Sequence, residues 1–113
     1  MLPKSKRVST ALFNQVLRSG FRFDSVFLTF RLLKLENDKE KRFTVAVPKR
    51  LASKAVYRNK IKRKAMAVLR VVFPVIKSGF AGIFFLKRDI SDLQRDDLEG
   101  EMKNLLGKAR ILI

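Results

Sequence analysis

The residues best suited to chemistry lie in a basic stretch in the middle of the chain, residues 49–64. Four cations and one amide follow each other closely there: Arg58, Asn59, Lys60, Lys62 and Arg63. A guanidinium can grip a phosphate through paired hydrogen bonds, whereas an ammonium acts as a point charge. When side chains of this kind lie on one helix, they can hold a sugar–phosphate backbone in place without reading its sequence. A purely solvated helix face is the alternative, and the Asn among the cations favours a bound polyanion.

The charge of the whole chain supports this interpretation. There are 26 Lys and Arg against 10 Asp and Glu, a formal net charge of +16. From Lys41 to Arg88 there are fourteen Lys and Arg and no acid, while six of the ten acids lie within Asp89–Glu101. Nucleic acid is the usual partner of a basic domain of this size.

Composition also excludes several classes of site. The chain has no Cys and no His, which rules out disulfides, thiolate–imidazole zinc sites and Ser-His or Cys-His nucleophiles. Residues 1–7 lack the apolar stretch of a secretory signal, and no run of about 18 apolar residues could span a bilayer. We therefore expect a cytoplasmic protein without a membrane partner, and its 113 residues suit one domain, 1–113.

The elements that must position the basic residues begin with a helix. Ser9 is a candidate N-cap, Leu12, Phe13, Val16 and Leu17 have helical spacing, and Gly20 suits a left-handed C-cap. Arg22 and Phe23 lead into a sheet. Residues 25–35 and 42–47 are β-prone and flank a polar turn, 36–40, so they are predicted to pair as a hairpin.

A long helix is predicted from residue 53 or 54 to Val72, where Pro74 follows. Its apolar arc comprises Tyr57, Ile61, Ala65, Val68 and Val72. The run 83–86 suits an interior strand, and Ser91 with Gln94 is a weak capping box for a last helix. Its inner face would be Leu98, Met102, Leu105, Leu106 and Ala109. The order α-β-β-α-β-α predicts an α+β fold: one layer of helices on a sheet of about four strands, with the other sheet face left for another contact.

At this point the sequence resembles a known family. Residues 58–63, Arg-Asn-Lys-Ile-Lys-Arg, resemble the R-N-x-x-K-R signature of the bacterial ribonuclease P protein. Residues 47–50, the N-terminal Leu-Pro-Lys with Arg7, and Lys87-Arg88 after the late strand extend the resemblance over nearly the whole chain. It implies a two-layer α/β sandwich with a left-handed β-α-β crossover, as in some ribosomal-protein-like folds, against the usual right-handed preference.

The resemblance also implies a function. The RNA subunit would perform Mg²⁺-dependent hydrolysis, and the protein alone would be inactive. The protein would bind that catalytic RNA and the 5′ leader of precursor tRNA, with no protein partner required. The residues implied for the RNA subunit are Lys49, Arg50, Arg58, Asn59, Lys60, Lys62 and Arg63. Those implied for the leader are Phe13, Leu17 and Phe30, because aromatic faces stack on bases of any sequence.

Departures and alternatives remain. Leu17 stands where the family has an aromatic residue, Met66 where it has a basic one, and residues 52–54 replace a small Gly. Each Phe could equally be a core residue. A ribosomal or other structural RNA-binding protein is the main alternative function. A transcription factor would need a short helix-turn-helix, and a protein-only nuclease would need carboxylates that the basic middle lacks.

Overall fold

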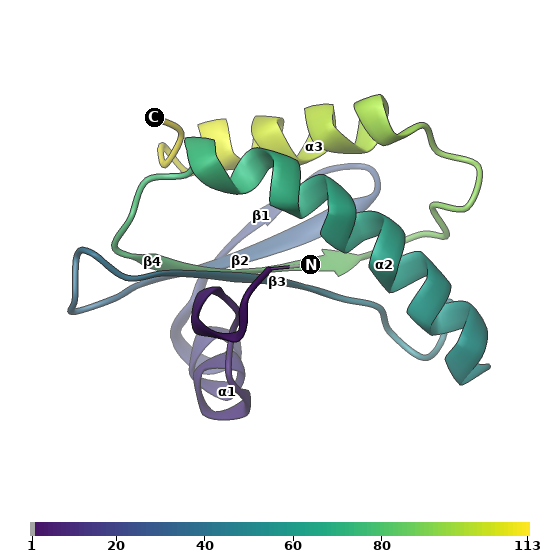
Figure 1. Ribbon diagram of the computed structural model, residues 1–113, viewed down its shortest axis with the longest axis horizontal. Helices are drawn as coiled ribbons and strands as arrows, with labels where there is room; N and C mark the ends of the chain where they lie inside the picture. Colours follow the sequence, from purple (N-terminus) through teal and green to yellow (C-terminus); the bar gives the residue numbers. More distant parts are fainter. Residues whose placement is uncertain (1) are drawn as a thin grey trace.

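The computed structural model describes residues 2–113, which form a mixed α+β fold around one four-stranded sheet (Figure 1). The chain order is η1 (Lys4–Lys6), α1 (Thr10–Ser19), β1 (Phe21–Asp24), β2 (Leu28–Lys34), β3 (Lys41–Ala46), α2 (Ala55–Val72), η2 (Phe73–Val75), β4 (Phe80–Leu86) and α3 (Arg95–Lys108), where η marks a short 3-10 helix. The predicted α+β class and the order of the main elements are confirmed. The residues expected to lead into the sheet form the short strand β1.

The strand order is β1-β2-β4-β3, so β4 lies between β2 and β3. β1 pairs with β2 and β2 with β4 in antiparallel fashion, whereas β3 and β4 are parallel. The predicted hairpin of residues 25–35 with 42–47 is therefore wrong, because these strands share no ladder. The physical reason is the apolar character of β4 on both faces, which suits it to the interior of the sheet.

The parallel pair β3 and β4 is joined through α2 by a left-handed crossover. In Figure 1 β3 lies nearest the viewer, α2 runs back above the sheet, and β4 lies behind β3. Such crossovers are nearly always right-handed. The handedness of the crossover decides which face of the sheet α2 covers, and α2 lies on the face opposite α1 (Figure 1).

The larger hydrophobic core lies between the sheet and the pair of helices α2 and α3, which cover one face (Figure 1). From β2, β3 and β4 it takes alternating side chains, among them the stacked rings of Phe30, Phe43 and Phe84. The inner face predicted for α3 is confirmed at Leu98, Met102, Leu105 and Leu106, which are all buried.

The helices do not form a single layer as predicted, because α1 packs on part of the opposite face of the sheet (Figure 1). Val16 of α1 is fully buried against Ala81 and Ile83 of β4. The amphipathic pattern of α1 requires an apolar surface, and this side of β4 supplies it. The uncovered rest of this face forms the floor of the hollow described below.

The helix caps agree only in part with those predicted from the sequence. The Ser9 side chain accepts a hydrogen bond from the Leu12 amide at 3.2 Å, as predicted for an N-cap. Gly20 is not left-handed: its φ is −76°, and a Cβ there would collide with the carbonyl oxygen of Val16. The predicted capping box of α3 is also wrong, since Gln94 is the N-cap and makes no side-chain cap bond.

Candidate RNA interface

The basic helix α2 begins at Ala55 after a loop that its own side chains hold in place. Arg58 donates from one guanidinium nitrogen to the carbonyl oxygens of Ala52 and Ser53, at 3.1 and 3.3 Å. Lys54 occupies the N-cap and gives no side-chain cap, so these contacts stabilise the entry to the helix instead. The remaining donors of the Arg58 fork can bind a ligand.

Three residues of the signature line one side of a hollow, which we call the α1–β3 cleft. Arg58, Asn59 and Lys62 come from α2, Val8 and Phe13 from the first helix and its approach, and Thr44 from β3. The volume is about 420 Å³. The structure thus brings the predicted Phe13 together with two of the predicted cations, Arg58 and Lys62, which lie more than forty residues away in the chain.

An aromatic residue that sequence reasoning missed stands next to Phe13. Phe85 of β4 is half-buried and meets Phe13 edge to face, with ring centroids 5.8 Å apart. In the sheet it lies between Thr29 of β2 and Ala46 of β3, so it faces the same side as the cleft. Strand β4 is apolar on both faces, and its sequence alone gave no signal that this ring would be partly open.

The prediction that Phe30 contacts the leader is wrong. It is 0% exposed and its ring stacks on Phe84 with centroids 4.4 Å apart, on the face covered by α2 and α3. A ring in that position cannot stack on an RNA base. Side chains alternate along a strand, so the β2 residues on the same side of the sheet as α1 and the cleft are Thr29, Arg31 and Leu33.

Leu17, the third residue expected at the leader, is 38% exposed on α1 and does not line the cleft. Its carbonyl oxygen accepts a hydrogen bond from Arg31 at 2.7 Å, which ties the end of α1 to the sheet. Its role in RNA binding stays a prediction.

The rest of the signature faces a second hollow, the α2–α3 hollow, of about 670 Å³. It is lined by Lys60, Arg63 and Lys64 of α2, Arg95 of α3, and Tyr57 and Ser91. Lys64 is held by the carbonyl oxygens of Ile90, Ser91 and Leu93. The cations of the signature are thus divided, because Arg58 and Lys62 line the α1–β3 cleft whereas Arg63 lines the α2–α3 hollow.

The predicted position of Tyr57 is also wrong. It was assigned to the buried arc of the helix, yet it is 41% exposed. Its hydroxyl pairs with the Ser91 hydroxyl at 2.7 Å and donates to the Asp89 carboxylate at 3.3 Å. The ring stays open because the chain that leads into α3 meets α2 here by polar contacts. A partly exposed aromatic ring beside cations suits nucleotide binding.

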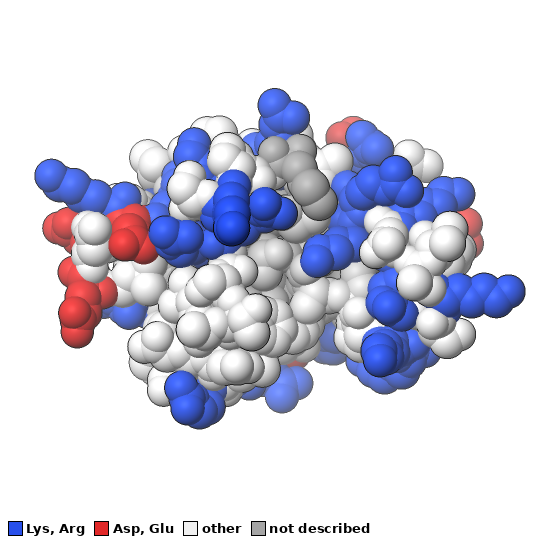
Figure 2. Space-filling model, turned by 60° about the horizontal axis from the view of Figure 1, so that its bottom comes forward, with Lys and Arg blue, Asp and Glu red and all other residues white. Residues whose placement is uncertain are grey.

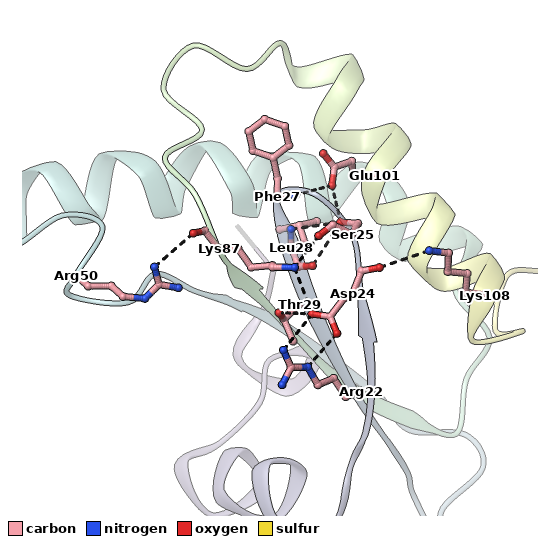
Figure 3. A network of polar contacts seen from close by, with 10 residues as sticks. All are labelled: Arg22, Asp24, Ser25, Phe27, Leu28, Thr29, Arg50, Lys87, Glu101 and Lys108. Atoms are coloured by element: carbon pink, nitrogen blue, oxygen red, sulfur yellow. Dashed lines mark hydrogen bonds and ion pairs between the residues drawn. The ribbon is translucent and has the colours of Figure 1, made fainter.

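Lys49 and Arg50 are exposed on the loop before α2. Arg50 reaches the carbonyl oxygen of Lys87, at 3.4 Å, which ties this loop to the end of β4 (Figure 3). Figure 2 shows Lys and Arg side chains gathered on the side of the molecule where this loop and the start of α2 lie. On this face the acids are mostly at the opposite edge, where the turn between β2 and β3 lies.

Two acids close to the basic surface are held ionised. Hydrogen bonds from Arg22 and then Thr29 lower the pKa of Asp24 from 3.8 to about 2, with Lys87 also contributing (Figure 3). Hydrogen bonds from the Ser91 hydroxyl and amide lower the pKa of Asp89. Among residues 2–113, no three His, Cys, Asp or Glu side chains are grouped closely enough to hold a metal ion.

Comparisons with known proteins identify the family of this chain. The family model described as "Ribonuclease P" matches residues 2–110. The chain belongs to the ribonuclease P protein family. The ribonuclease P protein component of Rippkaea orientalis is 33% identical over 116 residues, covering 98% of this chain and 91% of the relative. That of Microcystis aeruginosa is 32% identical, covering 88% and 86%.

The fold of the ribonuclease P protein family is also found in solved structures. A ribonuclease P protein mutant of Staphylococcus aureus gives a TM-score of 0.81 at 21% identity, covering 96% of this chain and 92% of that one. The ribonuclease P protein of Thermotoga maritima gives 0.76 at 21% identity, covering 90% and 96%. Membership implies a part in a tRNA-processing ribonucleoprotein with an RNA partner. Within residues 2–113, no helix is long and apolar enough to cross a membrane.

Proposed function

We propose that this chain binds the catalytic RNA of ribonuclease P and the 5′ leader of precursor tRNA in the cytoplasm. It thereby assists Mg²⁺-dependent removal of the leader. The observation that carries the proposal is the α1–β3 cleft, which combines an aromatic edge with Arg58, Asn59 and Lys62. Membership of the ribonuclease P protein family indicates that the RNA partner is ribonuclease P RNA.

The two sides of α2 suit two different contacts. The α1–β3 cleft is open along the sheet, and its aromatic pair Phe13 and Phe85 could stack on bases of any sequence. The α2–α3 hollow, together with Lys49 and Arg50 on the preceding loop, offers cations for a folded RNA backbone. A helix that carries cations on both flanks can therefore lie between leader and ribozyme.

The chain's own residues would position RNA and leave the chemistry to it. The resemblance assigns Arg58, Asn59 and Lys62 to the RNA subunit, but they line the cleft, and we assign them to the strand bound there. Arg58 and Lys62 would neutralise its phosphates, and the Asn59 amide would supply hydrogen-bond donors and an acceptor. Asp24 of β1 is separated from Phe85 by Thr29 of β2. It is already bound by Arg22, Thr29 and Lys87 and does not suit a protein-held Mg²⁺. Mg²⁺ would be held by the RNA subunit and substrate, and would supply the activated water and charge stabilisation of hydrolysis.

Reconstitution tests the proposal. The isolated protein should cleave nothing, and added to a ribonuclease P RNA it should lower the Mg²⁺ concentration needed for cleavage. It should also tighten binding of precursor tRNA more than that of mature tRNA, because only the precursor carries a leader. Equal effects on both tRNAs would remove the leader-binding claim.

A matched set of variants tests the cleft itself. Asn59→Ala with Lys62→Ala should weaken precursor binding by about tenfold while mature tRNA binding changes little, since charge-assisted hydrogen bonds are lost. Arg70→Ala removes an exposed cation from the same helix, outside both hollows, and serves as the control. Equal losses of precursor affinity in the double variant and in Arg70→Ala would indicate a non-specific effect of charge.

A further inference from the structure

A second basic hollow continues the α1–β3 cleft toward the N-terminus. We call it the N-terminal basic hollow. Its volume is about 500 Å³ and its cations are Lys4, Arg7, Arg42 and Lys62. It shares Val8, Ser9, Thr10, Thr44 and Lys62 with the cleft, so the two form one groove. Lys4, Arg7 and Arg42 lie outside the signature and come from a different part of the chain.

The backbone that carries Lys4 and Arg7 is held in place. Leu2 is buried in the larger core, which anchors the segment that leads into η1. The Arg7 amide donates to the Lys4 carbonyl oxygen at 3.2 Å, and the Arg42 guanidinium donates to the Arg7 carbonyl oxygen at 3.3 Å. The segment is therefore fastened to β3 before any ligand binds, which reduces the entropy lost on binding.

The charge in this hollow is poorly compensated. No carboxylate lines it. Glu40 pairs with Arg42 at 3.0 Å and compensates that cation, whereas Lys4, Arg7 and Lys62 have no ion-pair partner within residues 2–113. The Nε of Arg7 is closed off from solvent and lacks a hydrogen-bond partner among residues 2–113. Because this nitrogen has no accessible surface, an anion in the hollow would be bound by the other donors of the Arg7 guanidinium.

The neutral groups of the hollow also suit an anion. Ser9 and Thr10 form the start of α1, where free amides and the helix dipole favour negative charge. The Thr10 and Thr44 hydroxyls add donors on the two walls. Cations, hydroxyls and a helix N-terminus therefore converge on one space.

We propose that the N-terminal basic hollow binds a backbone phosphate of the same RNA strand whose bases occupy the cleft. This rests on the proposed function, in which that strand is the leader. The groove then has two unlike ends, with aromatic rings at Phe13 and Phe85 and a phosphate site at Lys4, Arg7 and Arg42. A single strand would lie in it in one register.

The chain offers a matched control for this site. Lys4 and Lys6 belong to the same short helix, but Lys6 lies over the ring of Phe73, 5.6 Å from its centroid, and does not line the hollow. In the reconstituted holoenzyme, Lys4→Met and Arg7→Met should each weaken precursor tRNA binding by about tenfold, and Lys6→Met should not. Each lost phosphate contact should also reduce the salt slope of binding by about one.

The source of the phosphate is tested with neutral methylphosphonates placed singly along the leader. At one leader position the substitution should weaken wild-type binding and have no further effect in Lys4→Met, because both changes remove the same contact. Lys4 is exposed, so this variant should fold even if Arg7→Met does not; circular dichroism checks both.

The outcomes separate the two proposals. If wild type favours precursor over mature tRNA but Lys4→Met behaves like Lys6→Met, only the phosphate site is overturned. It is also overturned if Lys4→Met weakens mature and precursor tRNA equally, since the phosphate then belongs to the ribozyme. If wild type does not distinguish the two tRNAs, both proposals fail.

Discussion

At the scale of single residues, the packing in the middle of the sheet requires a glycine at position 82. Gly82 of β4 faces the larger core, and a Cβ there would lie 2.5 Å from the Phe43 ring and 2.6 Å from the Phe30 ring. Gly82→Ala should therefore lower the free energy of unfolding by about 1–3 kcal/mol, because stacked rings have to move. Urea denaturation measures the loss. Gly100→Ala, an exposed helix position with nothing near its Cβ, should be neutral or stabilising.

Asp24 gives a second prediction at this scale, on pH. Its folded pKa is about 2 against 3.8, so its contribution is present above about pH 4 and is lost as the pH falls toward 2. The side chain is 41% exposed, so the stabilisation should stay below about 1 kcal/mol. Unfolding measured from pH 5 to pH 2 should show the difference between wild type and Asp24→Asn shrinking with acid. A constant difference would contradict this, and Asp92→Asn is the control.

At the scale of elements, one carboxylate fastens α3 to the turn between β1 and β2. Half-buried Glu101 accepts hydrogen bonds from the Ser25 hydroxyl and from the Phe27 amide, the latter at 3.1 Å (Figure 3). Glu101→Ala should lower the free energy of unfolding by about 1–3 kcal/mol, since two donors lose a charged acceptor. Glu99 of the same helix pairs with Lys103 at the surface, and Glu99→Ala should cost only about 0.3–0.5 kcal/mol. Chemical denaturation measures both changes. If Glu101→Ala and Glu99→Ala lose the same free energy of unfolding, the Glu101 contacts do not stabilise this junction.

At the scale of the whole molecule, a net charge of +16 should make RNA binding strongly salt-dependent. If about five or six phosphates are engaged, affinity for the ribozyme should fall on the order of 10³-fold between about 50 and 200 mM salt, by the slopes known for duplex DNA. Fluorescence anisotropy across a salt series measures the slope. A slope near zero would mean that the basic surface makes few phosphate contacts.

The sequence by itself determined the local elements and the chemistry they carry. Helix α2 was expected from residue 53 or 54 to 72 and runs over Ala55–Val72, and the Ser9 cap is present. The signature at residues 58–63 indicated the family that the comparisons show. These features follow from periodicity, capping and composition, which act over a few residues and can be read along the chain.

Only the tertiary structure decided which distant residues meet. It inserted β4 between β2 and β3, turned Phe30 into the core and left Phe85 partly open beside Phe13. It also divided the signature between two hollows and placed Arg7 next to Lys62 in a third. Strand order and register depend on apolar partners far apart in the chain, and a shift of one residue moves a side chain to the opposite face. No local pattern contains that information.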